Sequence, residues 1–129
     1  MAQVKVYALD RCLVPIRQQL SDTIHSCVVD ALDFPVGKRA HRFFPMVAED
    51  LFAPDGRSEA YTIVEITMIA GRSVQARKTL VRLLFERVES ACGIAPNDLE
   101  ICIYEVPAEN WGFRGQHGDE IVLDYRIDV

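Results

Sequence analysis

An internal repeat constrains the fold most, because the apolar pattern of the first half returns 60 residues later. Val4 and Val6, in an alternating segment, correspond to Val64 and Ile66. A stripe at helical spacing corresponds in the same way: Leu20, Ile24, Val28 and Ala31 fall on Leu80, Leu84, Val88 and Ala91. His41 and Phe43 fall on Ile101 and Ile103. The pattern predicts two tandem β-α-β units, about 1–58 and 59–129, in one domain spanning 1–129.

The fold class that follows is α+β. A right-handed crossover in each half puts both helices on one face of a mixed four-stranded sheet. Strands are expected at residues 3–8, at 42–47 on an edge or with a bulge because of Pro45, at 61–69 and at 99–106. Helices are expected from Leu13, with Pro15 in the first turn, and from Ser73 to Gly93. A short fifth strand is expected over 121–125.

The sheet face without helices has a mixed composition. It would carry Gln3, Lys5, Tyr7, Ile63, Glu65, Thr67, Ile69, Glu100, Cys102, Tyr104 and Val106. This set is too apolar for a solvated face and too polar for a dry core. Because large part-apolar patches seldom stay exposed on a monomer, it predicts an oligomer interface.

Charge and composition exclude several partners. The chain has 14 Lys and Arg against 19 Asp and Glu, a net charge of −5, which argues against nucleic acid and against an anionic membrane. No run approaches the roughly 20 apolar residues of a membrane span, and the first residues lack a signal-peptide pattern. The expected location is the cytoplasm.

The cysteines and histidines suggest neither a metal site nor a cofactor. The four cysteines form no CxxC pair, and we expect reduced, mostly buried thiols. The three histidines show no HxH, HxxxH or HExxH spacing, so no metal ligand is predicted. His25, on the first helix, and His117, in a glycine-rich tail, are expected at the surface or as caps.

Four short motifs occur in a characteristic order. They are Phe34-Pro35 after the first helix, Gly71-Arg72-Ser73 with Lys78, the run Gly93-Ile94-Ala95-Pro96-Asn97-Asp98, and Trp111-Gly112-Phe113. With the repeat, this order resembles the tautomerase superfamily, and most closely the branch that contains malonate semialdehyde decarboxylase. The resemblance implies a homotrimer with pockets between subunits and an N-terminal proline whose amine is the catalytic base. It also implies arginines that bind a substrate carboxylate, and aromatic pocket walls.

Three positions depart from that pattern. Ala2 stands where the family has its catalytic proline, Lys38 stands where the decarboxylase branch has an aspartate, and Ala70 replaces one of two arginines. Together these changes argue against decarboxylation. The catalytic candidate that stays is the α-amine of Ala2, if Met1 is removed, because an α-amine titrates near neutrality.

The substrate-binding candidates each have a structural alternative. Arg72, before a helix start, would bind a carboxylate, or else pair with a surface acid. Lys38 would form a second anion site, act as an acid or as an amine nucleophile, or lie in a solvated turn. Arg114 would be a second carboxylate contact. Trp111 and Phe113 would line the pocket or pin the C-terminal segment.

Two functions stay open. The first is keto–enol tautomerisation of a small 2-oxo acid in an inter-subunit pocket, an isomerase activity without cofactor. The alternative is a non-catalytic oligomeric scaffold, or a protein that binds a small anion, in which loss of the proline has ended catalysis.

Overall fold

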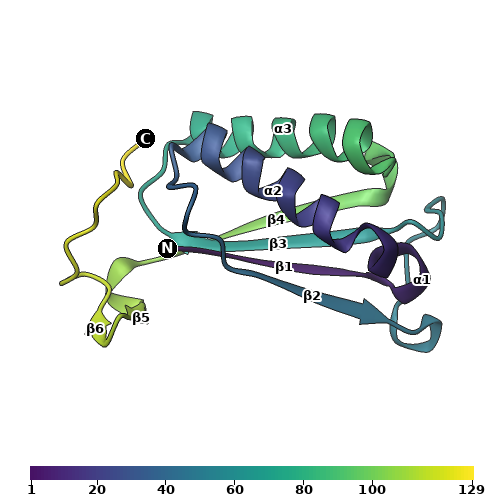
Figure 1. Ribbon diagram of the computed structural model, residues 1–129, viewed down its shortest axis with the longest axis horizontal. Coiled ribbons are helices and arrows are strands. Elements are labelled where there is room, and N and C mark those ends of the chain that lie inside the picture. Colours follow the sequence, from purple (N-terminus) through teal and green to yellow (C-terminus); the bar gives the residue numbers. More distant parts are fainter.

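A computed structural model describes residues 1–129 (Figure 1). Four strands form one mixed sheet in the order β2-β1-β3-β4: β1 (Ala2–Leu9), β2 (His41–Met46), β3 (Thr62–Ile69) and β4 (Leu99–Val106). The helices are α1 (Asp10–Leu13), α2 (Arg17–Leu32) and α3 (Val74–Cys92), and the long α2 and α3 lie side by side over one face. The predicted α+β architecture is confirmed.

The strand register preserves the repeat. Val4 pairs with His41 in the parallel pair β1–β2, and Val64 pairs with Ile101 in the parallel pair β3–β4. Each residue of the second pair is 60 positions beyond its counterpart in the first. The central strands β1 and β3 run antiparallel, with Lys5 opposite Glu65. The two halves are therefore related by a pseudo-twofold axis through the centre of the sheet, and β1 and β3 begin at opposite ends.

Local sequence signals set the helix boundaries. A 3₁₀ turn at Val14–Ile16, which contains Pro15, separates α1 from α2. The Ser73 side chain accepts a hydrogen bond from the Ala76 amide and caps α3, as predicted. Gly93 ends α3 in the left-handed conformation, and Asp33 ends α2 in the same way. Further 3₁₀ turns lie at Ala48–Asp50, Pro96–Asp98 and Ala108–Asn110.

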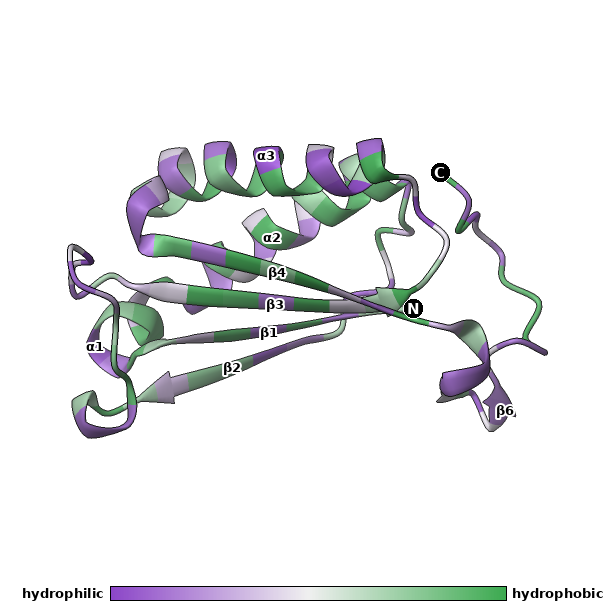
Figure 2. Ribbon diagram, turned by 180° about the vertical axis from the view of Figure 1, so that it is seen from behind, coloured by the Kyte–Doolittle hydropathy of each residue, from purple (hydrophilic) through white to green (hydrophobic).

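The core lies between the helices and the sheet. Its fully buried side chains come from both repeats, and the largest are Leu13, Leu20, Ile24, Leu32, Ile66, Met68, Leu80 and Leu84. Figure 2 shows hydrophilic colouring along the outer side of α3, away from the sheet. Burying one such side chain stabilises the fold by about 1.5–3 kcal/mol. The helix-free sheet face stays uncovered in the single chain, with Phe44 and Tyr104 exposed.

Several expectations about individual segments are wrong. Residues 121–125 form no strand; instead β5 (Gly112–Phe113) and β6 (Gln116–His117) make a small hairpin before an irregular tail. His25 is buried and not at the surface, with Nε2 2.6 Å from the carbonyl oxygen of Val36. Among the cysteines, Cys27 alone is fully buried, whereas Cys102 is exposed. No helix has both the length and the apolar character needed to cross a membrane.

Candidate functional site at the N-terminal end of the sheet

Arg72 is the buried cation of this chain. Gly71, with φ +139°, turns the backbone out of β3, and the Arg72 side chain folds back under the strand end, leaving 3% of the residue exposed. Nη1 donates a hydrogen bond to the carbonyl oxygen of Ile69 at 3.0 Å. Nε and Nη2, which lie along one edge of the guanidinium, are buried and have no partner. Burial lowers the pKa of Arg72, against the influence of Tyr125 and Glu105.

The guanidinium of Arg72 has two hydrogen-bond donors, Nε and Nη2, on one edge without a partner. A buried N–H group without an acceptor costs free energy, and the cost is larger for a charged group. A carboxylate accepts two parallel hydrogen bonds from such an edge, and this geometry is a strong form of anion recognition. The free edge of Arg72 is therefore suited to a carboxylate.

The N-terminal amine lies beside this arginine. The Met1 amine donates a hydrogen bond to the Tyr125 hydroxyl, and the carbonyl oxygen of Met1 accepts from the Ile69 amide at 3.1 Å. Burial, and after it the positive charges of Arg72, Lys38 and Arg114 in that order, together lower the pKa of the amine from 8.0 to about 5. At neutral pH the amine is thus an uncharged base.

Ala2, the position predicted to carry the amine, is buried in β1 opposite Met68. With Met1 present, the nitrogen of Ala2 belongs to a peptide bond, and the reactive amine is one residue further out. Removal of Met1 would move the terminal amine by up to about 3.6 Å, to the start of the strand.

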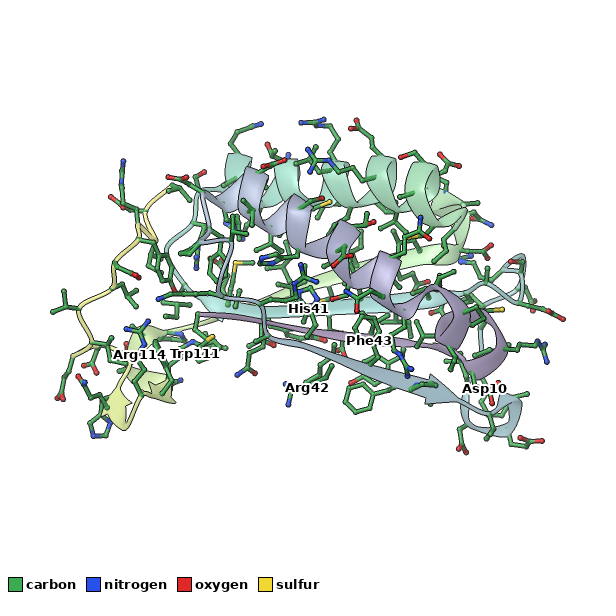
Figure 3. The ribbon with its side chains drawn as sticks, in the orientation of Figure 1. Asp10, His41, Arg42, Phe43, Trp111 and Arg114 are labelled. Atoms are coloured by element: carbon green, nitrogen blue, oxygen red, sulfur yellow. The ribbon has the colours of Figure 1, made fainter.

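The predicted cations gather around the amine. Lys38 Nζ lies 2.8 Å from Asp124 Oδ1 and 4.9 Å from the centroid of the Tyr125 ring. Arg114, in the left-handed conformation with φ +55°, has its guanidinium 5.9 Å from the Phe113 ring centroid. In Figure 3, Arg114 and Trp111 lie together near the N-terminal end of β1, at the opposite end of the sheet from Asp10.

The C-terminal tail covers this end of the sheet. The Tyr125 ring packs edge-on against Phe34 at a centroid distance of 5.2 Å. The carbonyl oxygen of Val129 accepts a hydrogen bond at 2.9 Å from the Ser73 amide at the start of α3. Figure 1 shows the tail rising from β6 past the N-terminus. The sequence pattern gave no signal for Tyr125, because only the folded chain brings it to Met1.

The tail leaves no cavity at this end of the sheet in the single chain, although Met1 and Tyr125 are only half-buried. None of the cavities in the structure is lined by Met1, Arg72 or Tyr125. A ligand that reaches the free edge of Arg72 must therefore displace part of the tail.

Comparison with known proteins identifies the family. Residues 38–114 match the family model described as "Tautomerase enzyme". The "Probable tautomerase YrdN" of Bacillus subtilis (strain 168) is 33% identical over 101 residues, which cover 74% of this chain and 78% of that protein. The chain belongs to the tautomerase family. The family match includes Lys38, Arg72 and Arg114, whereas the N-terminal amine and Tyr125 lie outside it.

Solved structures support the fold of this tautomerase-family chain. Malonate semialdehyde decarboxylase has a TM-score of 0.81 at 24% identity, over 92% of this chain and 99% of that one. A fused 4-OT described as an asymmetric trimer has a TM-score of 0.80 at 18% identity, over 91% and 96%. The resemblance inferred from the short motifs is confirmed at the level of the superfamily and its fold.

The two aromatic candidates have structural contacts in this tautomerase-family chain. The Trp111 indole donates a hydrogen bond to the carbonyl oxygen of Val106 at 3.2 Å, and its ring meets Phe113 edge-on at 6.2 Å. The Gly118 amide donates to the Trp111 carbonyl oxygen at 2.7 Å. These contacts fix the hairpin to the end of β4. Phe113 lines a hollow of about 340 Å³ in that hairpin, apart from the amine.

No cluster of three or more His, Cys, Asp or Glu side chains in the structure could hold a metal ion. The groups that meet at the site are one uncharged amine, one phenol and three cations.

Proposed function

We propose that this protein catalyses keto–enol tautomerisation of a small 2-oxo acid, an isomerase reaction. The observation that carries the proposal is the buried Arg72, which has a free Nε and Nη2 and whose charge helps to lower the pKa of the nearby amine to about 5. A carboxylate on that edge would put the neighbouring enol or keto group close to the amine.

The reaction needs only one proton carrier. The neutral amine accepts the proton of the enol hydroxyl, the C–C double bond shifts to C–O, and the protonated amine returns the proton to the adjacent carbon. Because its pKa is low, the amine is free to accept at neutral pH and donates readily once protonated. Arg72 and Lys38 would stabilise the negative charge that develops on the enolate oxygen.

The amine belongs to whichever residue is first in the chain. Met1 provides it in the structure, and Ala2 would provide it after removal of Met1, at the position where the family has its proline. Trp111, Phe113 and Arg114 are proposed to bound the pocket when the tail moves aside.

We also propose a homotrimer with pockets between subunits, and a cytoplasmic location. The proposal is supported by the uncovered, part-apolar sheet face and by the trimeric description of the similar fused 4-OT. Light scattering on a sizing column measures the mass directly. A monomer at micromolar concentration would contradict the trimer.

The experiment for the activity follows ketonisation of phenylenolpyruvate by ultraviolet absorbance. The N-terminus is first defined by intact mass, and proteins with and without Met1 are assayed separately. We expect a rate above buffer that is lost in Arg72→Lys, which keeps the charge but removes the two-donor edge. Arg82→Lys is the matched control, because Arg82 is exposed on α3 and pairs with Glu86. A rate equal to buffer for both N-termini would overturn the tautomerase proposal.

The alternative is a non-catalytic oligomeric scaffold that binds a small anion. The unpartnered Nε and Nη2 of Arg72 support anion binding, and the tail packed over this end of the sheet leaves no cavity for turnover in the single chain. Calorimetric titration with pyruvate distinguishes the two: binding that needs Arg72, without turnover, would support the anion-binding scaffold.

A further inference from the structure

A second cavity lies at the end of the sheet where β3 begins. The pseudo-twofold axis relates this end to the N-terminal site, because Ala2 lies opposite Met68 and Ala8 lies opposite Thr62 in the same pair of strands. Because the two strand registers differ by 60 residues, adding 60 to a residue number in the first half gives the equivalent position in the second half. Thr62 corresponds to Ala2, Ile94 to Phe34, and Cys12 to Arg72.

The cavity has a volume of about 210 Å³. The buried Ala8, Leu13 and Ile94 contribute to its floor, and the half-buried Cys12, Ile16 and Cys92 contribute to its rim. At the N-terminal end, Met1 and the tail occupy the corresponding space, whereas the tail does not reach this end (Figure 1). The fold thus leaves the counterpart of the N-terminal site open.

The lining of this cavity is uncharged. Where the N-terminal site has the guanidinium of Arg72, the far end has the thiol of Cys12. Burial raises the pKa of the Cys92 thiol, so it stays protonated and neutral near pH 7. An anion would find no countercharge there and would lose its hydration.

We propose that this cavity is a binding site for a small uncharged apolar molecule, of about the size of one benzene ring. An apolar cavity of about 150 Å³ is large enough to take benzene, whereas pockets for drug-sized ligands begin at about 300 Å³. The site is independent of the proposed tautomerase activity, since neither Arg72 nor the amine contributes to it.

The experiment is a titration of the isotope-labelled full chain with benzene, followed by backbone amide NMR. We expect saturable shifts at Ala8, Leu13 and Ile94, and none at Arg72 or Tyr125. Benzoate is the charged control, and we expect it to bind the far end at least about tenfold more weakly than benzene. Equal affinities for benzene and benzoate would overturn the proposal, as would the absence of saturable shifts at the far end.

Variants that fill the cavity test whether benzene binds in it. Cys12→Phe fills the cavity and should abolish saturation, whereas the near-isosteric Cys12→Ser should retain binding. Ala60→Leu fills the same space from the segment before β3 and gives a second test if Cys12→Phe does not fold. Arg72→Lys should bind benzene like the wild type, which separates this site from the proposed active site. Unchanged benzene affinity in a folded filling variant would overturn the proposal.

Discussion

Met1 and Tyr125 connect the two ends of the chain, because the terminal amine donates a hydrogen bond to the tyrosine hydroxyl. The ring of Tyr125 also packs on Phe34, which keeps it at the N-terminal end of β1. Since burial is the largest cause of the low amine pKa, the tyrosine ring, and not only its hydroxyl, should maintain that pKa.

We therefore expect Tyr125→Ala to raise the amine pKa from about 5 by at least about one unit, towards its ordinary value of 8.0. The pH dependence of N-terminal acetylation, read by mass spectrometry, measures this pKa. Tyr125→Phe is the matched control, because it keeps the ring and should keep the pKa low. Equal amine pKa values in the two variants would show that the ring does not cover the amine.

Arg72 is expected to lower the stability of the fold while it provides the carboxylate-binding group. Two of its buried nitrogens lack partners, so an apolar side chain of similar length should be tolerated or preferred. We expect Arg72→Met to leave the free energy of unfolding unchanged or raise it by up to about 2 kcal/mol, while carboxylate binding is lost. Urea unfolding measures the stability, with Arg82→Met as the exposed control. A loss above about 2 kcal/mol would mean that Nε and Nη2 are satisfied in solution.

The fold could be predicted from the sequence because its signals are local and occur twice. Ser73 and Gly93 mark the ends of α3 by their own side-chain chemistry, and Pro45 keeps β2 at an edge. The helix expected from Leu13, with Pro15 in its first turn, begins later than predicted: a 3₁₀ turn at Val14–Ile16 holds Pro15, and α2 begins at Arg17. The predicted strand over 121–125 fails because the segment pairs with no strand: only its last residue, Tyr125, packs on Phe34, and Val122 is exposed.

The site could be predicted only in part. Arg72 is a candidate from the sequence because it precedes a helix start and matches the family resemblance, and Lys38 and Arg114 are candidates as further anion contacts. The structure places all three close enough to the amine to lower its pKa. Tyr125 could not be found, because its contact with Met1 spans 124 positions and depends on the path of the tail. The missing partners of Arg72 are likewise a property of burial, which no short motif encodes.

His41 should make stability depend on pH. Its Nδ1 lies 2.8 Å from the Ser21 hydroxyl, and burial is the largest cause that lowers its pKa from 6.5 to about 4. The charges of His25 and Arg39 are the smaller causes of this lowering, and Asp22 opposes them. Between pH 4 and 6.5 the unfolded chain binds more protons at this position than the native chain, so stability falls as pH falls through that window.

We expect His41→Gln to remove part of this loss, on the order of 1–2 kcal/mol between pH 6.5 and 4 after allowance for solvent screening. Thermal unfolding at several pH values measures it. His117→Gln, in the exposed hairpin, is the control and should follow the wild type. If the His41→Gln and wild-type curves are parallel, His41 does not cause the pH dependence.

Gly71 allows the C-terminal tail to pack closely on the end of β3, because it has no Cβ where Ile127 lies. Its φ of +139° disfavours any side chain, and a Cβ built there would lie 2.8 Å from Ile127 Cγ2. We expect Gly71→Ala to destabilise the protein by about 1–3 kcal/mol through backbone strain and this contact. Gly37→Ala is the control, because a Cβ there meets nothing within 4 Å.

A double variant separates the two causes. In the Ile127→Ala background, Gly71→Ala keeps the backbone strain but loses the steric contact. The loss in free energy of unfolding caused by Gly71→Ala should therefore be smaller in that background than in the wild type, but not zero. The same variants should expose the amine, because displacement of Ile127 loosens the tail that carries Tyr125. Faster N-terminal acetylation in Gly71→Ala than in Gly37→Ala would link the turn at Gly71 to access to Arg72. Equal acetylation rates would mean that the tail stays in place when its anchor at Gly71 is disturbed.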